Sequence, residues 1–327
     1  MKRRDFVTLV GGAAAWPLAA RAQQSSTPFV AFINGRSSEA SVAVVAAFRK
    51  GLAETGYVEG QNVKVEYHYL EGQYDRLPVL LSDLIRRHVA VIATPGSIPA
   101  SLAAKAATTT VPIVFGVASD PVELGLVTSL TRPGGNATGI NYFANETAAK
   151  RLRLLRDLLP KAVRIVVLVN PVNVQATRST LQAVRESASA LGFQVRTLNA
   201  STIGEIDEAF GILTREHPDA LFVAPDAFLN THRGQFATLT AQAKLPSSFD
   251  DSEDVVAGGL MSYGTDKTDT FHQVGIYTGK ILKGAKPGEL PVVRSTKFVF
   301  AINMKTARAL GIEVRPDVLS IADEVIE

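Results

Sequence analysis

The second half of this 327-residue chain repeats the order of short motifs found in its first half. The segments FVAFIN, LAETGY and VKVEY are matched by VVLVN, ASALGF and QVRTL, in the same order and with a helical pattern after the first. Asn34 and Asn170 lie 136 positions apart, while Pro95 and Pro225 lie 130 apart. The stretches VPIVFGVASDPVE and LPSSFDDSEDVVA are 134 apart. Separations that drift this slowly indicate two similarly folded halves.

Each half alternates apolar runs of strand length with amphipathic stretches. The runs are rich in β-branched residues, as in VAVIAT, PIVFGV, RIVVLVN and ALFVAP, and helical patterns such as TLQAVRESASALG separate them. Nearly continuous apolar strands separated by helices indicate parallel sheets covered on both faces. We therefore predict an α/β protein of two doubly wound, Rossmann-like lobes. Ligands bind such lobes at the carboxyl ends of their strands, so two facing lobes predict one cleft between them.

The first 22 residues have the three parts of a secretory signal peptide. A basic head, KRR, precedes an apolar run of 14 residues and the small-x-small pattern Ala20-Arg21-Ala22. The run is shorter than the roughly 20 residues that span a bilayer. The RRDFV segment resembles a twin-arginine signal, which marks bacterial export, and the Sec route is the alternative. We expect cleavage after Ala22 and a mature protein that is free in the periplasm.

Removal of this leader changes the charge of the chain. It takes away four basic residues and one acidic residue, so the formal charge of +3 falls to zero. A neutral mature chain argues against nucleic acid or an anionic membrane as a partner. The chain contains no cysteine, which excludes disulfides and thiol chemistry.

The sequence lacks the common catalytic motifs. There is no G-x-S-x-G elbow, the glycine-rich RPGGNATG does not fit G-x-G-x-x-G, and GIYTGK is one residue short of a P-loop. The five histidines are scattered, so neither a zinc site nor another metal site is expected. The acidic segment 250–256, DDSEDVV, has the composition of a solvated helix start.

Several longer segments resemble the ABC-transporter substrate-binding proteins that are related to tryptophan and tyrosine binders. They are the stretch from FVAFINGRSSEAS to VKVEY, LTRPGGNATGI, PKAVRIVVLVNPVN and the region from GGLMSYG to MKTARALGI. The likeness covers almost the whole mature chain, and RPGGNATG and ILKGAKPGELPV are its most specific parts. It implies a type I periplasmic binding protein, without a cofactor, that holds a small solute between two hinged lobes. The partners it implies are that solute and the transmembrane subunits of an ABC permease.

The resemblance also implies how the chain divides. We expect the first lobe in 28–141 with about 260–288, and the second in 142–258 with about 292–327. A further crossing between the lobes is expected near 286–291, and Gly139 and the Gly258-Gly259 pair are candidate hinge residues.

In this family the solute contacts the loops that follow the strands. On the first lobe the corresponding residues are Asn34, Arg36, Ser37, Thr94, Ser97, Ser119 and Asp120. On the second lobe they are Asn170, Asn173 and Asp226, with Tyr263 near a lobe crossing. Hydroxyls and free N–H groups at a helix start can bind a carboxylate, which favours Ser97 and Ser119. Asp226 could accept an ammonium group, and Arg36 an anionic group through two hydrogen bonds. Helix capping alone is the competing explanation for Ser and Asp at these places.

These observations predict capture of an amino acid, an aromatic carboxylate or another small organic acid by closure of the lobes. One alternative is an exported α/β enzyme acting on a small organic acid, with Asp120 or Asp226 as its base. A second alternative is a ligand-sensing receptor module with the same fold.

Overall fold

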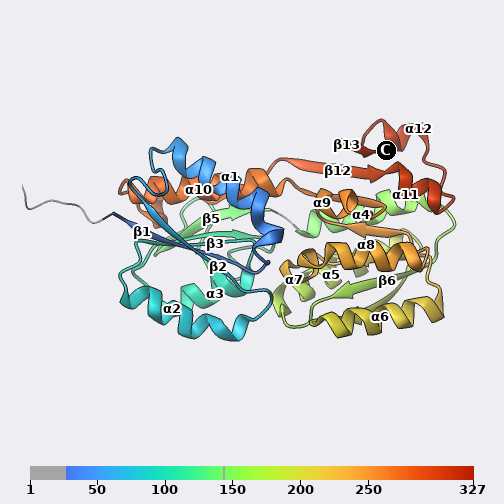
Figure 1. Ribbon diagram of the computed structural model, residues 1–327, viewed down its shortest axis with the longest axis horizontal. Coiled ribbons are helices and arrows are strands. Elements are labelled where there is room, and N and C mark those ends of the chain that lie inside the picture. Colours follow the sequence, from blue (N-terminus) through green and yellow to red (C-terminus); the bar gives the residue numbers. More distant parts are fainter. Residues whose placement is uncertain (1–26, 143) are drawn as a thin grey trace, which may run out of the picture.

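The structure is a computed structural model that describes residues 27–142 and 144–327. The expected signal peptide and its cleavage after Ala22 lie outside the described residues. The described chain forms two lobes that lie side by side, with the first on the left in Figure 1 and the second on the right.

The first lobe is built on a parallel sheet of six strands in the order β2-β1-β3-β4-β5-β11. Its strands are β1 (Phe29–Asn34), β2 (Lys64–Tyr69), β3 (Val91–Pro95), β4 (Ile113–Val117), β5 (Ala137–Asn141) and β11 (Val293–Arg294). Its helices are α1 (Val42–Glu54), α2 (Leu77–Arg86), α3 (Ile98–Ala107) and α10 (Lys267–Leu282).

The second lobe repeats this order in a sheet of seven strands, β7-β6-β8-β9-β10-β12-β13. Its strands are β6 (Arg164–Val169), β7 (Gln194–Asn199), β8 (Ala220–Val223), β9 (Ser247–Phe249), β10 (Met261–Thr265), β12 (Phe298–Asn303) and β13 (Glu324–Ile326). Only β12 runs antiparallel to its neighbour β10. Its helices are α4 (Ala144–Leu158), α5 (Val174–Ala190), α6 (Ile203–Glu216), α7 (Ala227–Thr231), α8 (Arg233–Gln242), α9 (Ser252–Val256), α11 (Met304–Ala309) and α12 (Pro316–Leu319).

The prediction of two doubly wound α/β lobes is confirmed by these matching strand orders, since β1 and β6 occupy equivalent places. Successive side chains of a strand point to opposite faces, and both faces are covered here. On β1, Val30 and Phe32 pack against α1 and α10, whereas Ala31 and Ile33 pack on the side of α2 and α3. A strand that is buried on both faces has to be apolar throughout, which explains the uninterrupted FVAFI run.

The described chain passes between the lobes at three places. These lie between β5 and α4, between β10 and α10, and between β11 and β12, and the last two form the upper links in Figure 1. Two expected boundaries differ from the structure. Residues 261–265 belong to the second sheet because β10 pairs with β9 and β12, so the chain returns to the first lobe only after Thr265. The last crossing follows Arg294 instead of lying at 286–291, because β11 pairs with β5 of the first sheet.

The glycines expected at hinges lie elsewhere. Gly139 is inside β5, where an added Cβ would come 2.0 Å from the Phe115 carbonyl oxygen, and a Cβ on Gly259 would meet the ring of Phe249 at 2.6 Å. Both positions therefore need glycine for close contact within a lobe. The same holds where α10 crosses α1, since a Cβ on Gly275 would lie 2.1 Å from the carbonyl oxygen of Phe48.

Within the part of the chain that the structure describes, no helix combines the length and the apolar character that crossing a membrane requires.

Candidate functional site

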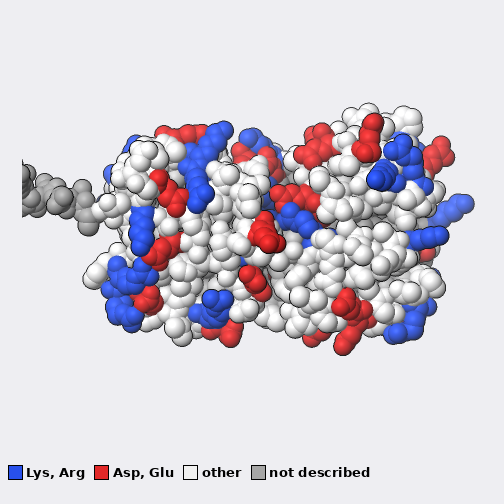
Figure 2. All heavy atoms as spheres, viewed as in Figure 1, with Lys and Arg blue, Asp and Glu red and all other residues white. Residues whose placement is uncertain are grey.

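The carboxyl ends of the strands of both lobes face one cavity of about 40 Å³. Its walls are formed by residues that follow β1, β3, β4, β5, β6, β8 and β9, together with the start of α10. In a 2-1-3-4-5 sheet the strand order reverses between β1 and β3, and the loops after these strands diverge and leave a crevice. Two such crevices face each other here. In Figure 2, acidic and basic side chains lie side by side in the middle of the molecule, where the lobes meet.

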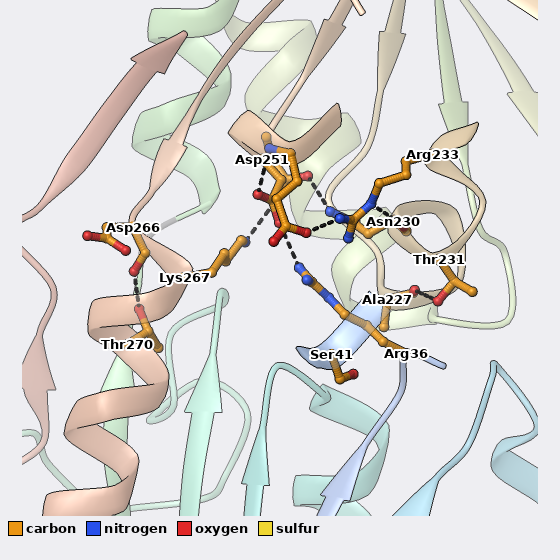
Figure 3. Close-up of polar contacts among 12 residues, drawn as sticks. Arg36, Ser41, Ala227, Asn230, Thr231, Arg233, Asp251, Asp266, Lys267 and Thr270 are labelled. Atoms are coloured by element: carbon orange, nitrogen blue, oxygen red, sulfur yellow. Dashed lines mark hydrogen bonds and ion pairs between the residues drawn. The ribbon is translucent and has the colours of Figure 1, made fainter. Parts of the chain in front are cut away.

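Arg36, on the loop after β1, lines this cavity and also contacts the opposite lobe. Its Nη2 donates to Oδ2 of Asp251 at 2.9 Å, and both side chains are buried (Figure 3). Burial alone would lower the pKa of Arg36, but the charge of Asp251 and its neighbours raises it above its ordinary value. The guanidinium is therefore a permanent positive charge in the wall of the cavity.

Lys267 places a second positive charge at the same cavity, at the first residue of α10. Its Nζ donates to Oδ2 of Asp250 at 2.8 Å and lies 4.8 Å from the centre of the Tyr142 ring. Burial raises the pKa of Asp250, but Lys267 and Arg151 lower it more, so that the pKa ends below its ordinary value. Within the described part of the chain, Oδ1 of Asp250 accepts only a long hydrogen bond, 3.4 Å, from the Asn230 amide.

Asp226 begins α7 and is held by four donors. Its Oδ1 accepts from the backbone N–H groups of Phe228 and Leu229 and from Asn170, while its Oδ2 accepts from Asn173 at 2.8 Å. Burial raises the pKa of this carboxyl above its ordinary value, although these hydrogen bonds act in the opposite direction. Asp226 therefore caps a helix and lines the cavity at the same time.

Several buried polar atoms at the strand ends have no hydrogen-bond partner among the described residues. Besides Arg36 Nη1, they are Asn34 Nδ2, Tyr74 OH, Ser119 Oγ, Asn141 Oδ1 and Asn173 Oδ1. A buried polar group without a partner costs free energy, about 1–3 kcal/mol each. Of these residues, Arg36 and Asn173 line the cavity, where a bound molecule would supply the missing partners.

The residues predicted from the sequence divide into three groups. Arg36, Asn173 and Asp226 line the cavity, and Asn170 supports them through its bond to Asp226. Asn34 orients the Arg36 loop by accepting its backbone N–H at 3.0 Å. The others do not line the cavity: Ser37, Thr94, Ser97, Ser119, Asp120 and Tyr263.

Five of these six outlying residues, all but Ser119, have local side-chain contacts. Ser97 caps α3 by accepting from Ala100, and Thr94 bonds Ser101 inside the first lobe. Asp120 is exposed and caps the turn that follows it. Ser37 accepts from Ala40, and the ring of Tyr263 in β10 stacks on Phe298.

The acidic segment 250–256 is not the solvated helix start that its composition suggests. Asp250, Asp251 and Asp254 are each less than one-tenth exposed. Arg151 of α4 lies fully buried nearby and donates to the carbonyl oxygens of Val223 and Ser248 at the ends of β8 and β9. Burial lowers the pKa of Arg151 to about 10, so it remains a cation that balances these carboxylates at neutral pH.

Sequence reasoning missed Tyr142, Asn230, Asp250, Lys267 and Phe271, which also line the cavity. Asp250 could have been found from the sequence, because the internal repeat aligns it with Gly116 near the carboxyl end of β4, where cleft residues are expected. Lys267 opens a helix directly after a strand, and the assignment of β10 to the wrong lobe hid that position.

Two doubly wound lobes that are linked by three crossings and meet at a polar cavity have the type I periplasmic binding fold, which is built to hold a solute between its lobes. The sequence pattern of the ABC transporter substrate binding protein family matches residues 30–326, and the chain belongs to this family. Its members are solute-binding components that work outside the cytoplasmic membrane.

Individual relatives agree with this assignment. The chain is 27% identical over 266 residues, 81% of this chain, to a tyrosine-binding protein of Clostridioides difficile, of which it covers 76%. The crystal structure of the ABC domain in complex with L-Trp from Streptococcus pneumonia matches with a TM-score of 0.83 and 25% identity over 92% of this chain and all of that one. The ligand-free, open structure of a substrate-binding protein with adhesive properties from Clostridium difficile has a TM-score of 0.64 at 25% identity, over 91% of this chain and 99% of that one.

Proposed function

We propose that this chain binds an α-amino acid in the cavity between its lobes and delivers it to the transmembrane subunits of an ABC importer. The observation that carries this proposal is the pairing of charges in one cavity wall. Arg36 and Lys267 supply two cations, and Asp226 and Asp250 supply two carboxylates. A zwitterion presents a charged partner to both kinds of group, whereas a simple acid offers a charged partner only to the cations and a sugar offers no charge to either.

The remaining hydrogen-bonding capacity of these groups suggests how the zwitterion lies. Oδ1 of Asp250 has one long contact and Oδ2 of Asp226 one short contact, so both can accept from an ammonium group. Nη1 of Arg36 has no partner among the described residues and can donate to a carboxylate. Charge-assisted hydrogen bonds of this kind are about twice as strong as neutral ones.

The side chain of the solute would face the apolar part of the wall. Tyr142 and Phe271 offer ring surfaces, and Ile98, Ala118 and Ala176 offer aliphatic surface. Two of the relatives named above are a tyrosine-binding protein and a complex with L-Trp, which supports an aromatic amino acid.

Capture by lobe closure is part of the proposal. The present arrangement is more similar to the complex with L-Trp than to the ligand-free, open relative, with TM-scores of 0.83 and 0.64 at the same identity. An equal identity means that sequence divergence does not account for the difference. We therefore interpret the described arrangement as the closed form, which a permease would recognise.

The remaining parts of the proposal concern place and partners. We propose export through the leader, cleavage after Ala22 and a periplasmic mature protein that neither spans the membrane nor binds nucleic acid. We also propose that it returns its solute unchanged and is not an enzyme.

Isothermal titration calorimetry on the mature chain tests the solute class. L-tyrosine and L-tryptophan should bind, with L-alanine and L-serine as smaller comparisons, while tyramine, which lacks the carboxylate, and phenylpropionate, which lacks the amine, should bind at least tenfold more weakly. Equal binding of tyramine and L-tyrosine would overturn the zwitterion assignment. Mass spectrometry and chiral chromatography of the recovered solute test the enzyme alternative, because turnover would change its mass or, for an isomerisation, its retention.

A further inference from the structure

The loop Gly35–Ser37, directly after β1, is one of the places where the first lobe touches the second at the cavity. Arg36 pairs with Asp251 (Figure 3). The backbone N–H of Ser37 donates to Oγ1 of Thr231 at 3.2 Å. A Cβ on Gly35 would come 2.8 Å from Cβ of Ala227, so the two lobes are in van der Waals contact there. These contacts exist only while the lobes are together, since one partner of each comes from each lobe.

The Arg36–Asp251 pair is the only ion pair among these three contacts. Arg36 lines the cavity, whereas Asp251 lies behind it and caps α9 by accepting the N–H of Glu253 at 3.3 Å. Both side chains of the pair are under one-tenth exposed. Nη2 of Arg36 is used by Asp251, and Nη1 has no partner in the described part of the chain. A planar guanidinium has fixed donor directions, so holding one nitrogen also fixes where the other one lies.

We propose that Asp251 is a positioning residue for solute recognition: when the lobes close, it holds the Arg36 guanidinium so that Nη1 binds the anionic group of the solute. This inference rests on the proposed function. Asp251 itself does not touch the solute. The Arg36 guanidinium thereby couples solute binding to lobe closure. Nη1 is oriented toward the anionic group only when the lobes have closed, and the Arg36–Asp251 pair stabilises the closed form.

The groups around the pair do not offer Asp251 a competing partner of equal quality. Arg233 is ion-paired with Glu253, and Lys267 with Asp250. Loss of the Asp251 charge should therefore release Arg36 in particular. A buried ion pair that loses one partner leaves the other charge uncompensated, which favours separation of the lobes and exposure of Arg36 to water.

The first test uses no solute. The natural sequence contains no cysteine, so Lys50→Cys on α1 and Gln242→Cys on α8 allow one spin label on each lobe. Asp251→Asn should shift the label distances in the solute-free protein toward longer values. Asp157→Asn, which removes an exposed ion-paired carboxylate of the second lobe, is the matched control and should leave them unchanged. Identical distances in Asp251→Asn and the unsubstituted protein would overturn the closure part of the inference.

The second test uses L-tyrosine and tyramine as probes. If Asp251 positions Arg36 for the carboxylate, Asp251→Asn should reduce the preference for L-tyrosine over tyramine by about tenfold, and Arg36→Gln should reduce it at least as much. The double variant should lose no more than Arg36→Gln alone, because both act through one guanidinium. A merely structural ion pair would weaken both probes equally, and an unchanged preference would overturn the positioning role. If neither probe binds the unsubstituted protein, the solute class is wrong, and the label distances still decide whether the pair holds the lobes together.

Discussion

Asp226 allows the helix cap and the charge to be separated experimentally. In Asp226→Asn, Oδ1 keeps the two backbone N–H groups of α7 and the bond from Asn170. The new amide faces the amide of Asn173, whose Oδ1 has no partner among the described residues. A half-turn of the Asn173 amide therefore restores an acceptor. Asparagine also caps helices about as well as aspartate. We therefore expect the free energy of unfolding to change by no more than about 1 kcal/mol.

Asp226→Ala should behave differently. It loses the cap, which is worth about 1 kcal/mol, and it leaves the amides of Asn170 and Asn173 without an acceptor. Each buried donor left without a partner costs about 1–3 kcal/mol, and the sum is about 3–5 kcal/mol once some water entry is allowed. Urea unfolding followed by circular dichroism measures both variants, since the only tryptophan, Trp16, is in the leader.

The pH dependence of the unfolding free energy shows whether the charge of Asp226 stabilises or destabilises the folded protein. Burial raises the pKa of Asp226 in the folded protein, so the folded state keeps this proton to a higher pH than the unfolded chain, where the carboxyl titrates near about 3.9. The unfolding free energy that Asp226 contributes therefore falls as the pH rises from about 3.9 through the folded pKa. Asp226→Asn lacks this fall, so it should gain stability relative to the unsubstituted protein as the pH rises above about 4. An Asn variant as unstable as the Ala variant, or a difference that does not depend on pH, would refute this reasoning.

Three further predictions follow from other parts of the molecule. Gly275→Ala should lower the unfolding free energy by about 3 kcal/mol or more, because its Cβ would meet a backbone carbonyl at 2.1 Å. The control Gly204→Ala, in an open part of α6, should raise the unfolding free energy by up to about 1 kcal/mol. Similar effects of the two variants in urea unfolding would contradict the close contact at Gly275. The intact mass of the periplasmic protein should show an N-terminus at Gln23, and a mature chain that retains the leader would exclude the signal peptide. Replacing the RR pair of the leader by KK should block export if the twin-arginine route is used. Saturation with L-tyrosine at 100 times its Kd should add about 2.7 kcal/mol of stability, seen as a higher Tm, and reduce the radius of gyration in solution scattering; superimposable scattering curves would argue against closure.

The sequence was sufficient to predict the fold because its strands are buried on both faces and the two halves repeat. A strand such as FVAFI must be apolar at every position, and this constraint is visible locally. The choice of sheet for β10 is not local: MSYGT is apolar enough for either lobe, and only its pairing with β9 and β12 decides the matter. The same limit explains the two misplaced boundaries.

The candidate site was predicted only in part, for a related reason. Residues at strand ends were found, and Arg36, Asn173 and Asp226 among them do line the cavity. The acidic segment after β9 reads as surface because four of its seven residues are acidic. The buried partners of this segment come from distant parts of the chain: Arg36, Arg151 and Lys267. No pattern within the segment predicts them. Charge balance across a fold is a long-range property.

The three crossings also set an order for synthesis and folding. The first sheet is complete only with β11, and its helix α10 packs on α1 from the other end of the chain, so the first lobe cannot finish before the second is almost entirely made. Between the end of β5 at Asn141 and the end of β11 at Arg294 lie about 150 residues. At about 5–20 residues per second the ribosome needs roughly 8–30 s for this stretch, during which the apolar faces of β1, β3 and β4 that α10 later covers remain open to chaperones or to aggregation. Neither lobe is a continuous piece of chain, so neither can be expressed alone by truncation, and a functional single-lobe version would require the termini to be rejoined elsewhere.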